Sequence, residues 1–138
     1  MKTSFLFLAL AGLLLLTNVP APSALGDELT SPARLSRTVV LRHVTADSSG
    51  TVSGTLINRT GLTLRDVKVE VNYAWVWSND FKPGEDSPGR TVYVTAPATI
   101  PPYGQASFSY QPSPPLPSRE DGHFVPSVHV IGFTQIGS

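Results

Sequence analysis

The chain has 138 residues, with ten basic and ten acidic residues and a formal net charge of zero. This length suits one domain, and a neutral chain lacks the long-range field that attracts nucleic acid or an anionic membrane. The chain contains no cysteine, which excludes disulfides, thiolate metal ligands and lipid attachment to a thiol.

The first 26 residues have the three-part layout of a secretory signal peptide. Lys2 supplies a positive start, residues 5–16 are apolar, and small residues at 24–26 form a cleavage site. We therefore expect cleavage after Gly26, no membrane insertion of the cleaved protein, and a secreted or periplasmic location. The alternative is an uncleaved membrane anchor, although the apolar run is shorter than the ~20 residues that a spanning helix needs.

The rest of the chain alternates between short strands and turns. We expect a flexible polar lead-in at residues 27–36 and a folded domain at 37–138. Period-two alternation and turn residues predict strands at 38–44, 51–58, 64–77, 90–95, 105–110 and 124–136. The last of these can be one long strand or two short ones. Proline and glycine predict loops at 78–89 and 111–122, and no segment shows helical spacing with capping signals.

The segment 64–77 is the most informative part of the sequence. Apolar or aromatic side chains occupy every second position, at Val67, Val69, Val71, Tyr73, Trp75 and Trp77. The positions between them are mostly charged or polar, at Asp66, Lys68, Glu70 and Asn72. This pattern predicts a strand with one buried face and one wet face, which is typical of an antiparallel sheet. Six or seven such strands in about 100 residues predict an all-β sandwich.

Both tryptophans of the chain, Trp75 and Trp77, lie at the end of this segment. Their phase places them on the buried face, so we expect both in the core. The alternative is an aromatic platform that binds a sugar or a peptide at the end of the strand. The candidate ligand-binding residues are then these two side chains together with Asp80, Phe81 and Tyr103.

The densest acidic stretch of the predicted fold lies in the loop after Trp77. It contains Asn79, Asp80, Glu85 and Asp86, whose oxygen atoms are potential Ca²⁺ ligands. Their spacing matches no known calcium loop, and a lysine lies among them. A solvated loop is therefore the favoured interpretation, and we expect no metal site.

The remaining chemical motifs are weak, so we expect neither an enzyme nor a cofactor. The three histidines, His43, His123 and His129, show no metal-ligand spacing. Asp121-Gly122 ahead of His123 favours a turn over a carboxylate–histidine pair for acid–base work. The segment Asn58-Arg59-Thr60 fits the N-glycosylation pattern, which three residues often match by chance.

From Val52 to Tyr110 the chain resembles bacterial FxLYD-type domains and related immunoglobulin-like modules of exported proteins. The matching segments are residues 54–61 (GTLINRTG), 64–71 (LRDVKVEV) and 100–108 (IPPYGQASF). The chain departs from the family at its name-giving aromatic–Asp–Gly turn, where it has Trp75-Val76-Trp77 and a longer loop. The resemblance implies a small antiparallel immunoglobulin-like β-sandwich, no catalytic residues, and a role that is unknown for most members.

The functional expectation is a non-enzymatic exported module that binds protein or cell-envelope material through loops or an exposed strand edge. The alternative is a carbohydrate-binding module that uses Trp75 and Trp77, with a cell-envelope polysaccharide as its ligand. Nucleic acid is not expected as a partner.

Overall fold

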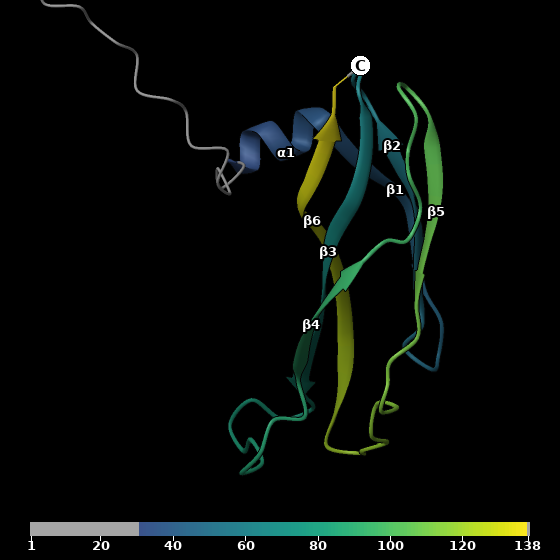
Figure 1. Cartoon of the computed structure of the whole chain (residues 1–138). Coiled ribbons are helices and arrows are strands. Elements are labelled where there is room, and N and C mark those ends of the chain that lie inside the picture. The colour runs from purple at the N-terminus through teal and green to yellow at the C-terminus, as the bar shows by residue number, and fades with distance from the viewer. Residues whose placement is uncertain (1–30, 138) are drawn as a thin grey trace, which may run out of the picture.

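A computed structural model describes residues 31–137, which form six strands and one short helix (Figure 1). The predicted signal peptide and the first residues of the predicted lead-in lie outside the described residues. Within the described part of the chain, no helix has the length and apolar character needed to cross a membrane.

The six strands form two antiparallel sheets that face each other. One sheet has the order β1-β2-β5, and its strands are β1 (Val39–Ala46), β2 (Val52–Asn58) and β5 (Gln105–Tyr110). The other has the order β4-β3-β6, and its strands are β4 (Arg90–Thr95), β3 (Thr63–Trp77) and β6 (Gly122–Ile136). These orders correspond to strands A-B-E and C′-C-F of immunoglobulin domains. The predicted immunoglobulin-like sandwich is therefore confirmed, with six strands.

The strand predictions agree with the structure within two residues at each end. The last strand is one long strand, paired along nearly all of β3. Its register against β3 shifts at two places, near Asp66 and near Ile131. Asp66 adopts a positive φ of 50°, as an extra residue in a bulge does when the strand bends.

The helix α1 (Pro32–Thr38) contradicts the expectation that this chain has no capped helix. Its signals are present in the sequence, because Ser31 accepts a hydrogen bond from the Arg34 N–H at 3.3 Å and proline occupies the first turn. A helix this short is marginal alone. Here Arg34 Nη2 donates to Gln135 Oε1 on β6 at 3.3 Å, so contact with the sandwich supports the helix. The second half of the predicted lead-in is therefore helical.

The core lies between the two sheets, and β3 is its main contributor. Val67, Val69, Val71 and Tyr73 are fully buried, which confirms the predicted phase of the strand up to that point. The facing sheet contributes Val52, Leu56 and Phe108. Removing a valine or leucine side chain from water contributes roughly 1.5–3 kcal/mol, so this strand dominates the stability of the fold.

Asn58 is a buried polar hub at the end of β2. Its side-chain nitrogen donates to the carbonyl oxygens of Leu62 (2.6 Å) and Pro101 (3.0 Å), and its oxygen accepts from the Thr60 N–H (2.9 Å). The side chain is only 1 % exposed. The expected local turn role of Asn58 is confirmed. A glycan has no access to this side chain in the folded protein, so the glycosylation motif is a chance match.

Tyr73 joins the core to the turn that precedes β2. Its hydroxyl donates to the Gly50 carbonyl oxygen at 2.6 Å, and burial raises the pKa of Tyr73 to about 12. A free tyrosine ionises near pH 10. The unfolded chain therefore loses this proton before the folded chain does, so the stabilising contribution is complete below about pH 10 and is lost as the pH rises toward 12.

We expect Tyr73→Phe to lower the free energy of unfolding by about 1–2 kcal/mol at neutral pH, because the Gly50 carbonyl loses its buried donor. At pH 11 the unfolded wild-type chain ionises Tyr73, whereas the variant has no hydroxyl at this position. The difference in unfolding free energy between the two proteins should therefore narrow by roughly 1 kcal/mol. Urea denaturation at both pH values measures this difference. Tyr103→Phe, on an exposed turn, is the control. If the difference in unfolding free energy between wild type and Tyr73→Phe stays constant with pH, the raised pKa of Tyr73 is contradicted.

Candidate functional site

Beyond Tyr73, β3 and β6 continue as a two-stranded ribbon. The pairing of β3 with β4 ends at Tyr73 and Arg90, whereas its pairing with β6 continues to Trp77 and Gly122. Because Tyr73 already reaches the turn ahead of β2, the ribbon extends past the end of the facing sheet (Figure 1). Trp75 and Trp77 keep the inward phase, but no sheet lies opposite them. Both are only half-buried, so the expectation that they belong to the core is wrong.

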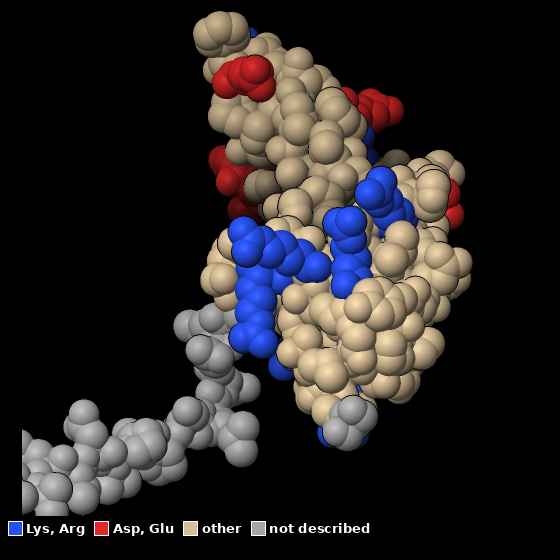
Figure 2. Space-filling view, turned by 90° about the horizontal axis from the view of Figure 1, so that it is seen from above, with Lys and Arg blue, Asp and Glu red and all other residues tan. Residues whose placement is uncertain are grey.

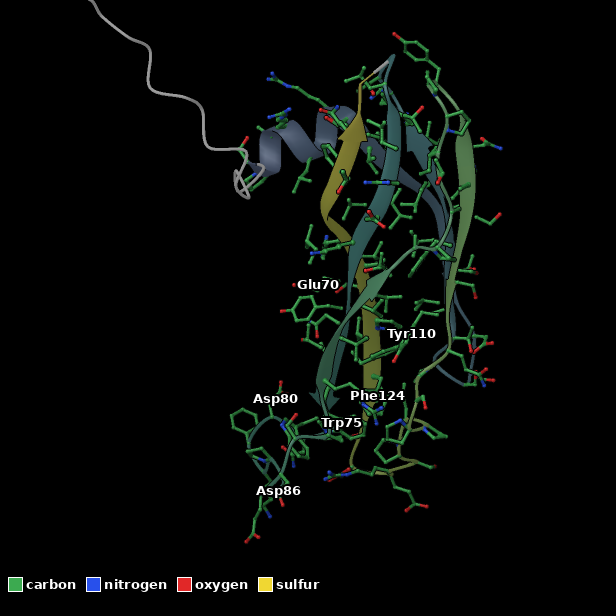
Figure 3. The ribbon with its side chains drawn as sticks, in the orientation of Figure 1. Glu70, Trp75, Asp80, Asp86, Tyr110 and Phe124 are labelled. Atoms are coloured by element: carbon green, nitrogen blue, oxygen red, sulfur yellow. The ribbon has the colours of Figure 1, made fainter. Side chains whose placement is uncertain are left out.

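The two tryptophans form an aromatic cluster with Phe124 of β6. The ring centroids of Trp75 and Trp77 are 5.9 Å apart with an interplanar angle of 86°. Those of Trp75 and Phe124 are 4.8 Å apart with an angle of 68°, and Figure 3 shows these two side chains together at the lower end of the strands. Both pairs have the edge-to-face geometry that aromatic rings favour. The indoles are not coplanar and therefore do not form a flat platform.

Arg119 completes the aromatic cluster. Its guanidinium carbon lies 5.3 Å from the Trp75 ring centroid and 5.4 Å from that of Trp77, which is within the range of cation–π attraction. Its Nε donates to Asp121 Oδ1 at 2.9 Å, and its Nη1 donates to the Asp86 carbonyl oxygen at 2.8 Å. Arg119 therefore connects the loop before β6 to the loop after β3.

The ion pair of Arg119 and Asp121 shifts both groups in the expected directions. The hydrogen bond from Arg119 lowers the pKa of the Asp121 carboxyl, and the same bond raises the pKa of the Arg119 guanidinium. Because the aspartate pKa is lowered in the folded state, the pair stabilises the fold at neutral pH. This contribution is lost as the pH falls below the ordinary value of an aspartate toward the lowered one.

The loop of residues 78–89, which we call the distal loop, has a defined local structure. The Asn79 side chain accepts from the Phe81 N–H at 3.0 Å, and the Lys82 N–H donates to the Asn79 carbonyl oxygen at 3.1 Å. Gly84 lies against the edge of the Trp77 ring, where a Cβ would come within 2.8 Å of two ring carbons. Phe81, at the tip, is 97 % exposed. Asp80 and Asp86 lie on the same loop, beyond the end of the sheet (Figure 3).

A groove of about 610 Å³ lies beside the aromatic cluster. Trp75 and Phe124 line it together with Ser48 and Ser118 from the two neighbouring loops. The Nε1 atom of Trp75 is buried and has no hydrogen-bond partner among the described residues. An unpaired buried donor is unfavourable, so an acceptor that reached this atom would be stabilised by it.

One wall of the groove is a rigid turn. The Asp47 carboxylate accepts from the Ser49 hydroxyl (2.6 Å) and from the N–H groups of Ser49 (2.9 Å) and Thr51 (3.0 Å). The hydrogen bond from Ser49 is the main cause of a lowered Asp47 pKa. These hydrogen bonds fix the local conformation of the turn at this wall.

Tyr103 lies far from the other candidate residues. Its N–H donates to the Thr60 carbonyl oxygen at 3.0 Å, close to the start of β3, whereas the tryptophans lie at the end of that strand. A strand of this length spans roughly 45 Å at about 3.3 Å per residue. The structure therefore brings together Trp75 and Trp77, places Asp80 and Phe81 on the adjoining loop, and excludes Tyr103 from the site.

Among residues 31–137, no three histidine or carboxylate side chains lie close enough to hold a metal ion. His123 lies opposite Val76 and His129 opposite Glu70, on the outer face of the sheet. Asp121 pairs with Arg119 rather than with His123.

Sequence reasoning did not identify Arg119 and Phe124 as members of the site. Phe124 alternates with Pro126 and Val128 and could have been placed on the inward face of the last strand. Its position opposite Trp75 depends on the register between β3 and β6, which are far apart in the sequence. Arg119 lies in a proline-rich loop whose path no local pattern specifies.

A scan against models of known protein families gave no match for this chain, and neither did searches of curated proteins and of solved structures. The resemblance to FxLYD-type domains therefore stays a prediction. The site has to be interpreted from its own geometry.

We expect Arg119→Ala to shift tryptophan emission to longer wavelength, to increase quenching by iodide and to lower the melting temperature by a few degrees. The reason is that Arg119 lies over both indoles and connects two loops. Arg42→Ala, on the exposed part of β1, should change none of these properties. Unchanged emission in the Arg119 variant would mean that the guanidinium does not shield the tryptophans.

Proposed function

We propose that this protein is a non-enzymatic binding module that contacts a protein partner through the distal loop, with Phe81 as its anchor. The observation that carries the proposal is the exposure of Phe81, which is 97 % accessible to water on a loop with its own hydrogen bonds. Burying such a ring in a partner's pocket gains roughly 1.5–3 kcal/mol. A loop that is already ordered loses little conformational entropy on binding.

The charges around Phe81 indicate the chemistry of that partner. Asp80, Glu85 and Asp86 outnumber Lys82 on the distal loop, and Glu120 and Asp121 lie on the loop that Arg119 connects to it. Figure 2, which looks down on the opposite end, shows Lys and Arg side chains gathered near the middle of that view, with Asp and Glu side chains around its margin. The partner surface should therefore combine an apolar pocket with basic residues, because opposite charges steer association. The predicted export signal places such a partner among exported or envelope proteins.

Photo-cross-linking tests this proposal directly. A benzophenone amino acid at position 81 should give a discrete adduct in the producing cells, and the yield should fall at high salt because screening weakens the charge attraction. The same amino acid at position 103 is the control, since Tyr103 is 74 % exposed at the other end of the molecule. No adduct from position 81, or equal adducts from both positions, would overturn the proposal.

A second candidate is the binding of a saccharide in the groove beside Trp75. The observation in its favour is the buried, unpartnered Nε1 of Trp75, since Trp75 lines a groove that Ser48 and Ser118 also line. Sugar hydroxyls would accept from this N–H and donate to the polar side chains, while the hydrophobic ring edge packs against the sugar. The covered and perpendicular indoles give this candidate less support than the exposed Phe81 gives the first one.

Titration with cell-envelope oligosaccharides, followed by tryptophan fluorescence, tests the second candidate. Trp75→Phe removes the Nε1 donor and should weaken binding by about tenfold, since one hydrogen bond to a buried donor is worth about 1.4 kcal/mol. Trp77→Phe is the matched control and should bind almost normally. Absence of any fluorescence change in the wild-type protein would exclude these oligosaccharides as ligands.

A further inference from the structure

An apolar groove of about 620 Å³ lies between the edge strands β1 and β6, beside α1. Its walls are mostly aliphatic side chains, namely Leu35 of α1, Val39, Val40 and Leu41 of β1, and Val130 and Ile131 of β6. It shares no lining residue with the groove beside Trp75. Figure 1 shows α1 toward one end of the sandwich and the loop between β3 and β4 at the other end. The groove and the distal loop are therefore separate surfaces of the molecule.

The three elements that form this groove carry positive formal charge and no negative charge. Helix α1 contains Arg34 and Arg37, β1 contains Arg42, and all three side chains are exposed. Neither α1, β1 nor β6 contains an aspartate or a glutamate. The distal loop, residues 78–89, has the opposite balance, with three carboxylates and one lysine. An apolar group that is flanked by carboxylates is therefore attracted to the groove.

The distal loop carries such an apolar group. Phe81 at its tip is 97 % exposed, and Asp80 precedes it directly. Burial of this ring requires an apolar pocket, and the neighbouring carboxylates favour a pocket with basic residues beside it. The groove between β1 and β6 has both properties. The groove beside Trp75 fits less well, because Asp47 lies in its wall and the acidic distal loop is close to it.

Phe81 does not reach this groove within its own chain. Val130 of the groove pairs with Val69, whereas the distal loop begins after Trp77 at the end of the same strand. These two positions of β3 are roughly 26 Å apart at about 3.3 Å per residue. The loop is also held at its base, where Gly84 lies against the Trp77 ring. A contact between Phe81 and this groove therefore requires two molecules.

We propose that the partner of the distal loop is a second copy of this chain, with Phe81 of one copy in the groove between β1 and β6 of the next. This inference rests on the proposed function and names its partner. The carboxylates of the loop then lie near Arg37 and Arg42 of the neighbouring copy. Because two different surfaces meet, each contact leaves one groove and one loop unused. Such a head-to-tail contact continues into a chain of molecules or closes into a ring.

Two other occupants of the groove predict different behaviour. Of the residues outside the described part of the chain, 27–30 and Ser138 remain after the predicted cleavage, and Leu29 is their one large apolar side chain. If these residues filled the groove, the protein would stay monomeric and Phe81 would stay exposed. If two β6 edges paired, a dimer would form in which Phe81 takes no part. A head-to-tail contact covers the groove and Phe81 together, which favours it over both.

The test measures the mass of the purified protein by light scattering up to about 1 mM, where even a weak contact is detected. We expect association that grows with concentration and weakens at high salt. Phe81→Ala removes the anchor ring and should weaken association by about tenfold or more. Tyr93→Ala, which removes a ring that is 68 % exposed on β4, is the control and should change association by less than about twofold.

Two isoleucines of β6 provide a matched pair for the groove. Ile131 lines it and Ile136 does not, yet they are 38 % and 39 % exposed. Ile131→Asp should weaken association by about tenfold or more, because a carboxylate in the groove is desolvated and repels the acidic loop. Ile136→Asp should change it by less than about twofold. Arg42→Glu, at an exposed position beside the groove, should weaken association in the same direction and replaces Ile131→Asp if that variant does not fold.

A mixture of the two impaired variants identifies the geometry of the contact. Phe81→Ala retains an intact groove and Ile131→Asp retains an intact Phe81. Each variant should therefore be monomeric at a concentration where the wild-type protein associates, whereas their mixture should form a one-to-one dimer that does not grow further.

Three results would overturn the proposal. They are a wild-type protein that stays monomeric at every concentration, a mixture of the variants that stays monomeric, and a dimer that persists in Phe81→Ala alone. The cross-linking experiment at position 81 separates this inference from the function on which it rests. An adduct with twice the mass of the chain supports both. An adduct with a different protein supports only the proposed function, and no adduct contradicts both.

Discussion

From Lys68 to Tyr73, β3 is hydrogen-bonded on both sides, to β4 along one edge and to β6 along the other. Its inward side chains, Val67, Val69, Val71 and Tyr73, are fully buried against the facing sheet. Every other part of the fold is positioned relative to this strand. A one-residue slip would turn its valines toward water and its charged residues toward the core, so hydrophobic burial sets the register of the whole sheet.

The pairing of β3 with β6 also explains why the molecule has features outside its core. The two strands are longer than the strands of the facing sheet, so their ends project as a ribbon. The inward side of this ribbon has no sheet to pack against, and the aromatic cluster and Arg119 cover each other instead. Arg119 binds both loops and gives the distal loop a fixed base. The exposed Phe81 is thereby held at the tip of an ordered structure.

Among residues 31–137, no strand pairs with the edge of β6 that faces away from β3. β6 uses one edge to pair with β3, and its other edge faces the groove beside β1. The distal loop and this groove involve different chemistry, since the first presents an aromatic ring among carboxylates and the second an apolar slot beside backbone groups. Both features follow from the long antiparallel pairing of β3 with β6 within a small sandwich.

Period-two alternation in the amino-acid sequence determined the class of the fold, the six strands and the inward side of β3, because burial of one strand face acts locally on every second residue. The sequence also determined the turn at Asn58, because the side-chain amide of this residue hydrogen-bonds to residues nearby along the chain. The helix α1 needed contact with β6, and the role of Asn58 includes a bond to Pro101, far along the chain. Local pattern could not show that the facing sheet ends before Trp75, that Phe124 lies opposite it, or that Tyr103 is at the other end. Those facts depend on register and strand length across the two sheets, which only the tertiary structure decided.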